Sequence, residues 1–261
     1  MMVQEIFNEY ARFTQVESMA IGGSRALKKK DAYSDYDVYV YCKEEIPVDD
    51  RRVVLEKYCS RMELGNCYRE YEDNCIMEDG MALNIIYRNT DAFLAGIGEV
   101  VEGHQPQGGC TTCMWHSLLT GRIAYDKGGR LAEAKQKYVV RYPQPLKHNI
   151  ITYNMQFIKY GINTYLEQIT RAMKRGDLIS INREVDKFLA SYFDVIFAVN
   201  EKLHPGEKRL MDICKKECRV LPDNFERNIK ALLLNMCKDP TAISYVNTML
   251  LELEKVLGQE L

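Results

Sequence analysis

Hydrophobic and polar residues alternate differently in the two halves of this chain. Before Leu131, short runs of β-branched and aromatic residues, typical of strands, lie between segments with apolar residues three or four positions apart. From Leu131 onward the three-to-four spacing dominates over long stretches, which indicates amphipathic helices. The pattern predicts an α+β chain, in which an α/β part gives way to a helical bundle between Asp126 and Pro145.

The first half predicts helices and strands in succession. An amphipathic helix over 3–16 leads into a hydrophobic strand that ends at Ile21, and the run Val38-Tyr39-Val40-Tyr41 alternates as a strand does. The other elements predicted here are a helix over 47–62, strands over 66–72 and 75–77 around a turn at Asp73-Asn74, a strand over 81–87, a helix over 90–101, a short helix over 110–119 and a strand over 122–126.

The second half predicts a bundle of long helices. Prolines stand where these helices should begin or end, because a residue without a backbone N–H is tolerated there. The change of pattern divides the chain into two expected domains, 1–135 and 136–261. The predicted helices cover 150–174, 178–203, 206–218, 224–237 and 241–257.

Composition narrows the class of protein. A formal net charge of -2 argues against broad, sequence-independent binding of nucleic acid, which needs a basic surface. No apolar run approaches the length of a membrane span, and the amphipathic, partly acidic start is unlike a signal peptide. Nine scattered cysteines fit reduced thiols. We therefore expect a cytoplasmic protein, monomeric or homodimeric, that does not bind membranes.

The candidate chemistry lies between Ile21 and Tyr41. Gly22-Gly23-Ser24 offers uncrowded backbone N–H groups, and a helix that started there would add partial positive charge for a phosphate. Asp35 and Asp37 fall on one face of the next predicted strand, with Cα atoms roughly 7 Å apart. Two carboxylates so close favour a divalent cation, and hard oxygen ligands suit Mg²⁺. A phosphate seat beside a cation site is what nucleotidyl transfer needs.

The order of these residues resembles the signature of the polymerase-β-type nucleotidyltransferase superfamily. That signature is a hydrophobic segment, a glycine turn such as Gly22-Gly23-Ser24, a gap and an Asp-x-Asp on a strand such as Asp35-x-Asp37. The chain looks most similar to small bacterial antibiotic nucleotidyltransferases of the kanamycin and lincosamide types, and to a related uncharacterised bacterial group. Residues 111–116 and 200–209 resemble that group.

The resemblance implies a fold and a reaction. It implies a nucleotidyltransferase-like mixed sheet with flanking helices over 1–135 and a helical, substrate-binding domain over 136–261. It implies a bacterial enzyme that binds a nucleoside triphosphate, ATP in the first place, as its Mg²⁺ complex in the cleft between the domains. A hydroxyl group of a small acceptor would attack the α-phosphorus and release pyrophosphate.

The resemblance also assigns residues to these roles. The carboxylates of Asp35 and Asp37 would hold the metal and act in catalysis. The turn of Gly22, Gly23 and Ser24 would bind the phosphates of the nucleotide. A βα loop with a solvated aspartate pair is the plainer alternative for the same residues.

A third acid, usual in this superfamily, is missing from its expected place. By the Leu-x-Ile-Ile-Tyr-Arg pattern the matching residue is Asn84, whose amide can ligate a metal but cannot accept a proton. Three interpretations stay open. Asn84 could be a weak catalytic ligand with a base from the helical domain, or Glu78 or Asp79 could substitute. Alternatively, the site is defective and the protein binds or senses nucleotides without efficient transfer.

Charged residues of the second half are candidates for the remaining roles. A base from a second-domain helix is implied by the resemblance, and Glu184 and Asp186 are the best-placed acids by composition, although a solvated helix face is the plainer role. Lys208 could bind phosphate, or it could belong to a salt-bridged helix start. Lys28 to Lys30 could contact the triphosphate, or form a solvated loop.

One cysteine-histidine cluster has ligands suited to zinc. Cys110, Cys113 and His116 follow His104 in the sequence. The predicted helix over 110–119 and the lack of a second Cys-x2-Cys pair favour a helix start with core packing instead.

Overall fold

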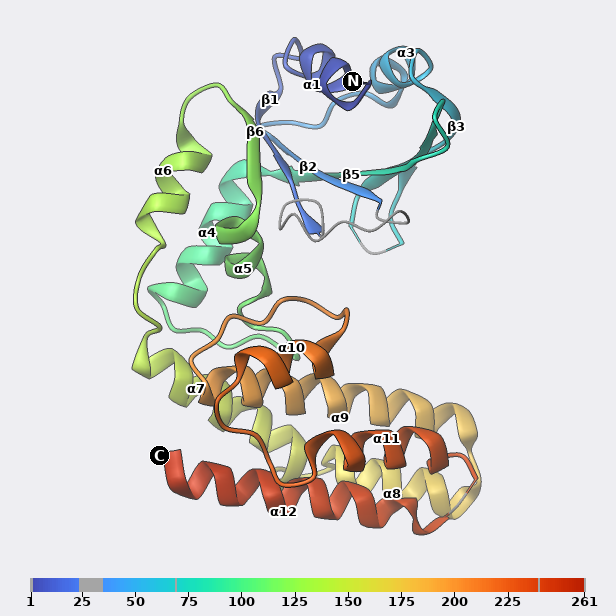
Figure 1. Ribbon diagram of the computed structural model, residues 1–261, viewed down its shortest axis with the longest axis vertical. Coiled ribbons are helices and arrows are strands. Elements are labelled where there is room, and N and C mark those ends of the chain that lie inside the picture. The colour runs from blue at the N-terminus through green and yellow to red at the C-terminus, as the bar shows by residue number, and fades with distance from the viewer. Residues whose placement is uncertain (1, 24–34, 69, 239, 261) are drawn as a thin grey trace. The chain divides into compact units, whose positions relative to one another are not determined.

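The chain divides into two compact units (Figure 1). We call Met1–Gly98 with Ser117–Val140 the α/β unit, and Glu99–His116 with Arg141–Leu261 the helical unit. The computed structural model describes residues 2–23, 35–68, 70–238 and 240–260.

The α/β unit is built on one mixed sheet. In the described residues its strand order is β3-β4-β5-β2-β1-β6, in which the β2–β5 pair is parallel and the other pairs are antiparallel. The chain between β2 and β5 is long enough for the crossover that a parallel pair requires. The strands are β1 (Val16–Ile21), β2 (Tyr36–Cys42), β3 (Cys59–Asn66), β4 (Glu72–Met77), β5 (Ala82–Asn89) and β6 (Arg122–Asp126).

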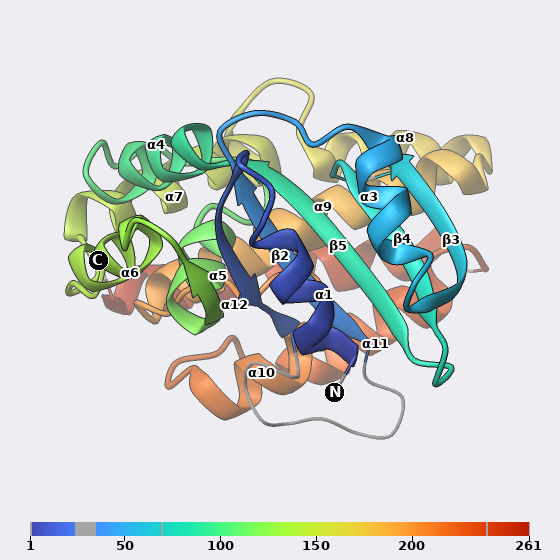
Figure 2. The same ribbon diagram turned by 90° about the horizontal axis from the view of Figure 1, so that it is seen from above.

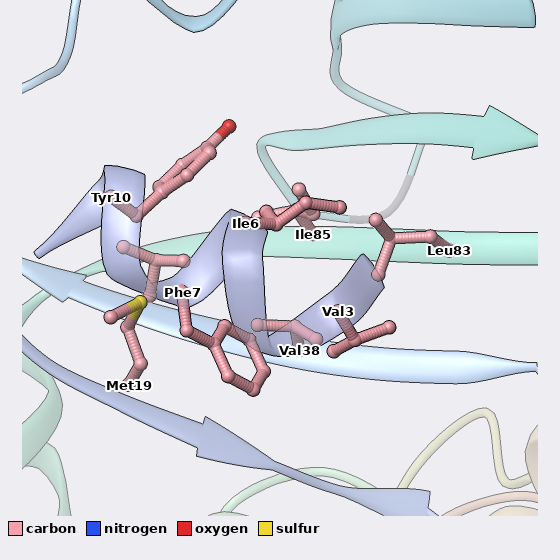
Figure 3. A pocket seen from close by; sticks show the side chains of 9 residues that line it. Val3, Ile6, Phe7, Tyr10, Met19, Val38, Leu83 and Ile85 are labelled. Atoms are coloured by element: carbon pink, nitrogen blue, oxygen red, sulfur yellow. The ribbon is translucent and has the colours of Figure 1, made fainter. Parts of the chain in front are cut away.

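Two helices cover one face of this sheet. Figure 2 shows α1 (Met2–Tyr10) and α3 (Val48–Leu55) lying over it. The face is apolar because alternate strand residues, such as Val38 and Ile85, point toward it. Side chains of α1 pack against both (Figure 3) and close the space between to anything the size of a water molecule. The residues that line this space are therefore part of the hydrophobic core. The unit also contains α6 (Arg130–Lys137) and parts of α4 (Thr90–Val101) and α5 (Cys113–Thr120).

A buried ion pair joins α3 to the same face of the sheet. Arg51 Nη1 donates to Asp73 Oδ1 at 2.7 Å, and neither side chain is exposed. Asp73 also accepts from the Gly65 backbone N–H at 2.8 Å and from the Tyr87 hydroxyl at 2.7 Å. The guanidinium carbon lies 4.5 Å from the centroid of the Tyr87 ring. Both charges are thus paired and hydrogen-bonded, as charged groups in a core must be.

The turn predicted at Asp73-Asn74 is wrong. Strand β4 runs through both residues, with Asn74 paired to Asn84 of β5. Asp and Asn favour turns because their short polar side chains bond to the local backbone. Here Arg51 of helix α3 donates the hydrogen bond that Asp73 needs, so the local preference for a turn is overridden. The helix predicted over 47–62 is also too long, because α3 ends at Leu55.

The helical unit is a bundle, as predicted. Helix α9 packs against α7 and α8, and α12 packs against α8 and α11 (Figure 1). Most of the predicted helices correspond to one observed helix with ends a few residues away. The bounds are α7 (Gln144–Met155), α8 (Tyr165–Arg175), α9 (Leu178–Val199), α10 (Leu210–Glu217), α11 (Phe225–Asn235) and α12 (Ile243–Glu260), with a 3-10 turn at Pro240–Ala242.

The single helix predicted over 150–174 is two helices. A π-helical turn, Gln156–Tyr160, follows α7, and the chain then bends at Gly161. A Cβ atom at Gly161 would lie 2.6 Å from the Gln156 carbonyl oxygen, so the bend needs glycine. Thr164 begins the second helix, because its hydroxyl accepts from the Glu167 backbone N–H at 3.3 Å.

Residues 99–116 belong to the helical unit because buried polar groups tie them to it. Asp194 of α9 accepts from the Thr111 backbone N–H at 3.1 Å, from the Thr111 hydroxyl at 2.8 Å and from Asn154 Nδ2 at 3.0 Å. The Thr112 hydroxyl accepts from the His204 backbone N–H at 2.7 Å. Burial raises the pKa of Asp194 to about 6, although the bonds from Thr111 and Asn154 lower it.

The predicted fold class is confirmed: a mixed sheet with flanking helices stands before a set of C-terminal helices. Among the helices that the structure describes, none combines the length and the apolar character needed to cross a bilayer.

We expect Arg51→Met to lower the free energy of unfolding by about 3–5 kcal/mol, because it leaves the Asp73 carboxylate buried without its cation. Arg52→Met is the matched control, since Arg52 is exposed on the same helix, and it should change the value by less than about 0.5 kcal/mol. Urea unfolding of the two variants measures the difference. Equal losses would contradict the importance of the buried pair.

Asp194 should make stability depend on pH. The folded carboxyl keeps its proton to a higher pH than the unfolded one, so the free energy of unfolding should fall by about 3 kcal/mol as the pH rises from about 4 to about 6. Asp194→Asn cannot ionise, and its new amide can donate to Asn154 Oδ1, which has no hydrogen-bond partner among the described residues. The difference in unfolding free energy between variant and wild type should therefore grow with pH across this range. A constant difference from pH 4 to pH 7 would count against this role.

Candidate functional site

The glycine turn after β1 lies directly against the side chain of Asp37. Gly22 donates its backbone N–H to the Asp37 carbonyl oxygen at 2.8 Å, which fixes the turn beside β2. Gly23 has φ +61°, and a Cβ atom there would lie 2.4 Å from Asp37 Oδ2. Any other residue at position 23 would therefore be strained and would displace the carboxylate. The sequence predicts this proximity, and the structure places the two groups together.

A ring on the same face of β2 supports the turn from the other side. A Cβ atom at Gly22 would lie 2.3 Å from Tyr39 Cε2, so only glycine fits over the ring. The Arg88 guanidinium carbon lies 4.2 Å from the Tyr39 ring centroid, and Arg88 makes two bonds of 2.7 Å to the Glu70 carboxylate. Sequence reasoning missed this support. The signal was the strand period, which puts Tyr39 on the same face as Asp37.

Asn84 lies beside Asp37, as the family pattern predicts for the third acid. The parallel register pairs Asp37 with Asn84, and Asn84 Nδ2 donates to Asp37 Oδ1 at 3.3 Å. The structure brings the two positions together. The Asn84 amide thus donates a hydrogen bond to Asp37, whereas an acid in its place would repel the Asp37 carboxylate.

Asp35 is the exposed residue directly before β2. Strand alternation begins at Tyr36, so the shared face predicted for Asp35 and Asp37 stays a prediction. Ser24 and Lys28 to Lys30 lie outside the described residues.

The residues around Asp37 fit a hard divalent cation. Gly23 leaves the space next to Asp37 Oδ2 that a Cβ atom would fill. Oxygen atoms of carboxylates and amides are the ligands that Mg²⁺ prefers. Asp37 supplies a carboxylate, and Asn84 would supply an amide oxygen with its side chain turned over, because its Nδ2 now faces Asp37. Within the described part of the chain, no cluster of three or more Asp, Glu, His and Cys side chains could hold a metal ion. The candidate site therefore has fewer acids than a typical closed metal site.

The candidate residues of the helical unit have different surroundings. Glu184 is half-buried on α9 and pairs with Lys187 at 2.9 Å, whereas Asp186 on the same helix is exposed. Lys208 is exposed in the loop before α10. Their proposed roles as base and phosphate contact stay predictions. Glu78 and Asp79 are exposed at the turn between β4 and β5.

The cysteine-histidine cluster lies at a helix start, where the sequence predicts one. Helix α5 begins at Cys113, and the Sγ atoms of Cys110 and Cys113 lie 3.3 Å apart. Burial lowers the pKa of His116, although nearby Glu217 raises it. The described residues form no three-ligand group around these side chains.

Comparison with protein families gives one match. Residues 112–210 match a domain of unknown function, DUF4037. The two stretches that resemble an uncharacterised bacterial group, 111–116 and 200–209, lie at the two ends of this match. Comparison with curated proteins gives no significant match.

Several solved structures are similar to this chain. A nucleotidyltransferase-like protein from Exiguobacterium sibiricum has 12% identity and a TM-score of 0.44, with 97% of this chain and 72% of that chain covered. An aminoglycoside 6-adenyltransferase from Bacillus subtilis has 9% identity and a TM-score of 0.31, with 98% and 90% covered. A Thermotoga maritima CCA-adding enzyme, solved with tRNA, has 12% identity and a TM-score of 0.31, with 98% and 64% covered.

These three matches all have less than 25% identity and TM-scores below 0.5. Because the identities and TM-scores are low, we rest no functional inference on them. The chemistry of the residues around Asp37 carries the proposal below.

The contact between Gly23 and Asp37 gives a test of the site. Gly23→Ala should cost about 1 kcal/mol of stability through its positive φ, and should weaken Mn²⁺ binding about tenfold or more by displacing the carboxylate. Gly80→Ala is the matched control, because Gly80 also has positive φ, +82°, but nothing lies within 4 Å of its Cβ position. Thermal unfolding and Mn²⁺ titration separate strain from displacement. Equal Mn²⁺ affinity in the two variants would argue against a cation site at Asp37.

Proposed function

We propose that this protein transfers a nucleoside monophosphate from a nucleoside triphosphate to a hydroxyl group of a small acceptor and releases pyrophosphate. The observation that carries the proposal is the contact of the Gly22-Gly23 turn with the Asp37 carboxylate. A glycine turn can bind phosphate through backbone N–H groups, and a carboxylate beside it can hold the cation that accompanies phosphate. Nucleotidyl transfer requires these two functions next to each other.

Each residue has a role in this proposal. Asp35 and Asp37 hold Mg²⁺, which when bound neutralises charge on the triphosphate. Gly23 and Ser24 orient the phosphates by backbone and hydroxyl donors, and Gly22, whose N–H is bonded to the Asp37 carbonyl oxygen, holds the phosphate-binding turn beside β2. The Tyr39 ring keeps the turn in place, because the turn rests on it and Arg88 packs on its face.

The acceptor is proposed to be a small hydroxylated molecule. A net charge of -2 supports this over a long nucleic acid, which binds to basic surfaces. ATP is the proposed nucleotide, and Lys208 a proposed phosphate contact. The helical unit is proposed to bind the acceptor, and Glu184 or Asp186 to act as base. A bacterial source and a cytoplasmic location are part of the same proposal.

A second candidate is a nucleotide-binding or sensing protein with little turnover. The bond from Asn84 to Asp37 favours it, because an amide in this place cannot take a proton from an attacking hydroxyl. Such a protein would still bind MgATP, and binding to the native state would raise its melting temperature.

Pyrophosphate release across a panel of nucleotides and hydroxylated acceptors tests the proposal. We expect Mg²⁺-dependent release that Asp35→Asn and Asp37→Asn each reduce on the order of a hundredfold or more, because each removes charge facing the phosphates. Asp50→Asn is the control, since Asp50 is exposed on α3 and should leave the rate unchanged.

Thermal unfolding with nucleotide, measured alongside pyrophosphate release, separates the two candidate functions. Nucleotide-induced thermal stabilisation without pyrophosphate release in any combination would favour sensing. Full turnover by Asp37→Asn would refute the role of this carboxylate in either one.

A further inference from the structure

Three asparagines on neighbouring strands form a ladder that ends at Asp37. Asn66 lies at the end of β3, Asn74 on β4 and Asn84 on β5, and the sheet order β3-β4-β5-β2 continues to Asp37. Asn66 Nδ2 donates to Asn74 Oδ1, Asn74 Nδ2 donates to Asn84 Oδ1 at 3.0 Å, and Asn84 Nδ2 donates to Asp37 Oδ1 at 3.3 Å. The three amides are half-buried on one face of the sheet.

The direction of this ladder is set at its Asp37 end. An isolated carboxylate only accepts hydrogen bonds, so it needs the donor of Asn84 and turns the amide oxygen of Asn84 toward Asn74. Asn74 must then present its own donor, and it turns its oxygen toward Asn66 for the same reason. At the far end Asn66 Oδ1 accepts from the Tyr68 backbone N–H at 3.5 Å, and Tyr68 is exposed. Water can satisfy either group of Asn66 there.

A ladder of primary amides has a second direction, which keeps the bonds between the amides but loses the bond from the Tyr68 backbone N–H to Asn66. An amide presents a donor on one side and an acceptor on the other, and the two exchange when its side chain turns over. If all three amides turn, every internal bond of the ladder is kept with donor and acceptor exchanged. Asn84 Oδ1 then faces Asp37. Two oxygen atoms in that position repel each other unless a cation lies between them.

We propose that this ladder is a reversible relay, in which Asn66 and Asn74 position Asn84 so that it gives Asp37 a donor without cation and gives a divalent cation an oxygen ligand when one binds. This inference rests on the cation site of the proposed function. It assigns Asn84 as a ligand, and it makes Asn66 and Asn74 positioning residues that touch neither cation nor substrate. Asn74 is the critical member, because it must be able to both donate and accept.

Titration of the protein with MgCl₂ tests the relay without nucleotide or turnover. In protein labelled with ¹⁵N-asparagine, we expect the side-chain amide signals of Asn66, Asn74 and Asn84 to shift together, with one apparent Kd. Single substitutions assign the signals. Mg²⁺ binding that shifts Asn84 alone would overturn the relay and leave the cation site standing. No Mg²⁺ binding at all would overturn both the relay and the cation site.

Two substitutions of Asn74 should change Mn²⁺ affinity in opposite directions. Asn74→Leu leaves Asn84 without its partner and should weaken binding about tenfold, as loss of a group behind a metal ligand typically does. Asn74→Asp accepts from both neighbours, which holds Asn84 Oδ1 toward Asp37, and should strengthen binding. Ile76→Asp is the charge control, because it adds a carboxylate to the same face of β4 outside the ladder.

These variants give clear outcomes. Unchanged Mn²⁺ affinity in Asn74→Leu would overturn the relay, and so would an affinity of Asn74→Asp no higher than that of Ile76→Asp. Asn66→Leu is a second variant at the solvent-facing end, and it should weaken binding in the same direction even if Asn74→Leu fails to fold.

Discussion

The carboxylate of Asp37 is the constraint around which the candidate site is organised. It lies between Gly23, where an added Cβ atom would overlap it, and the side-chain amide of Asn84, which donates one hydrogen bond to it. Among the described residues no lysine or arginine pairs with it. A negative charge held in place by neutral groups keeps its attraction for a cation. The glycine turn and Asn84 contact this carboxylate, and the ring of Tyr39 supports the turn.

The aspartates on the two faces of the sheet have contrasting surroundings. On the face toward α1 and α3, Asp73 is fully buried and its charge is matched by Arg51 and two further donors. On the other face, Asp37 remains half-buried with a neutral amide beside it. The first arrangement stabilises the core and has no capacity left for a ligand. The second leaves a charge that a ligand can complete, which is why the proposed chemistry is assigned to that face.

Local patterns predicted most of the elements but failed where a distant residue decided the outcome. The helix over 90–101 and the strand over 122–126 were predicted with the ends that the structure has. Asp73 and Asn74 were predicted as a turn. The structure places them in a strand, where their partners Arg51 and Asn84 come from other elements. The break at Gly161 within 150–174 depends on one close backbone contact that apolar spacing does not report.

The sequence by itself predicted an α/β part followed by a helical part, and a glycine turn one short loop away from Asp35 and Asp37, because period, turn chemistry and spacing are local properties. Only the tertiary structure decided that Asn84 donates to Asp37, that Asn66 and Asn74 stand behind it, and that Thr111 joins the helical unit through Asp194. Those outcomes depend on strand order and register. Neither can be predicted from a single stretch of the chain, because each joins residues that are far apart in sequence.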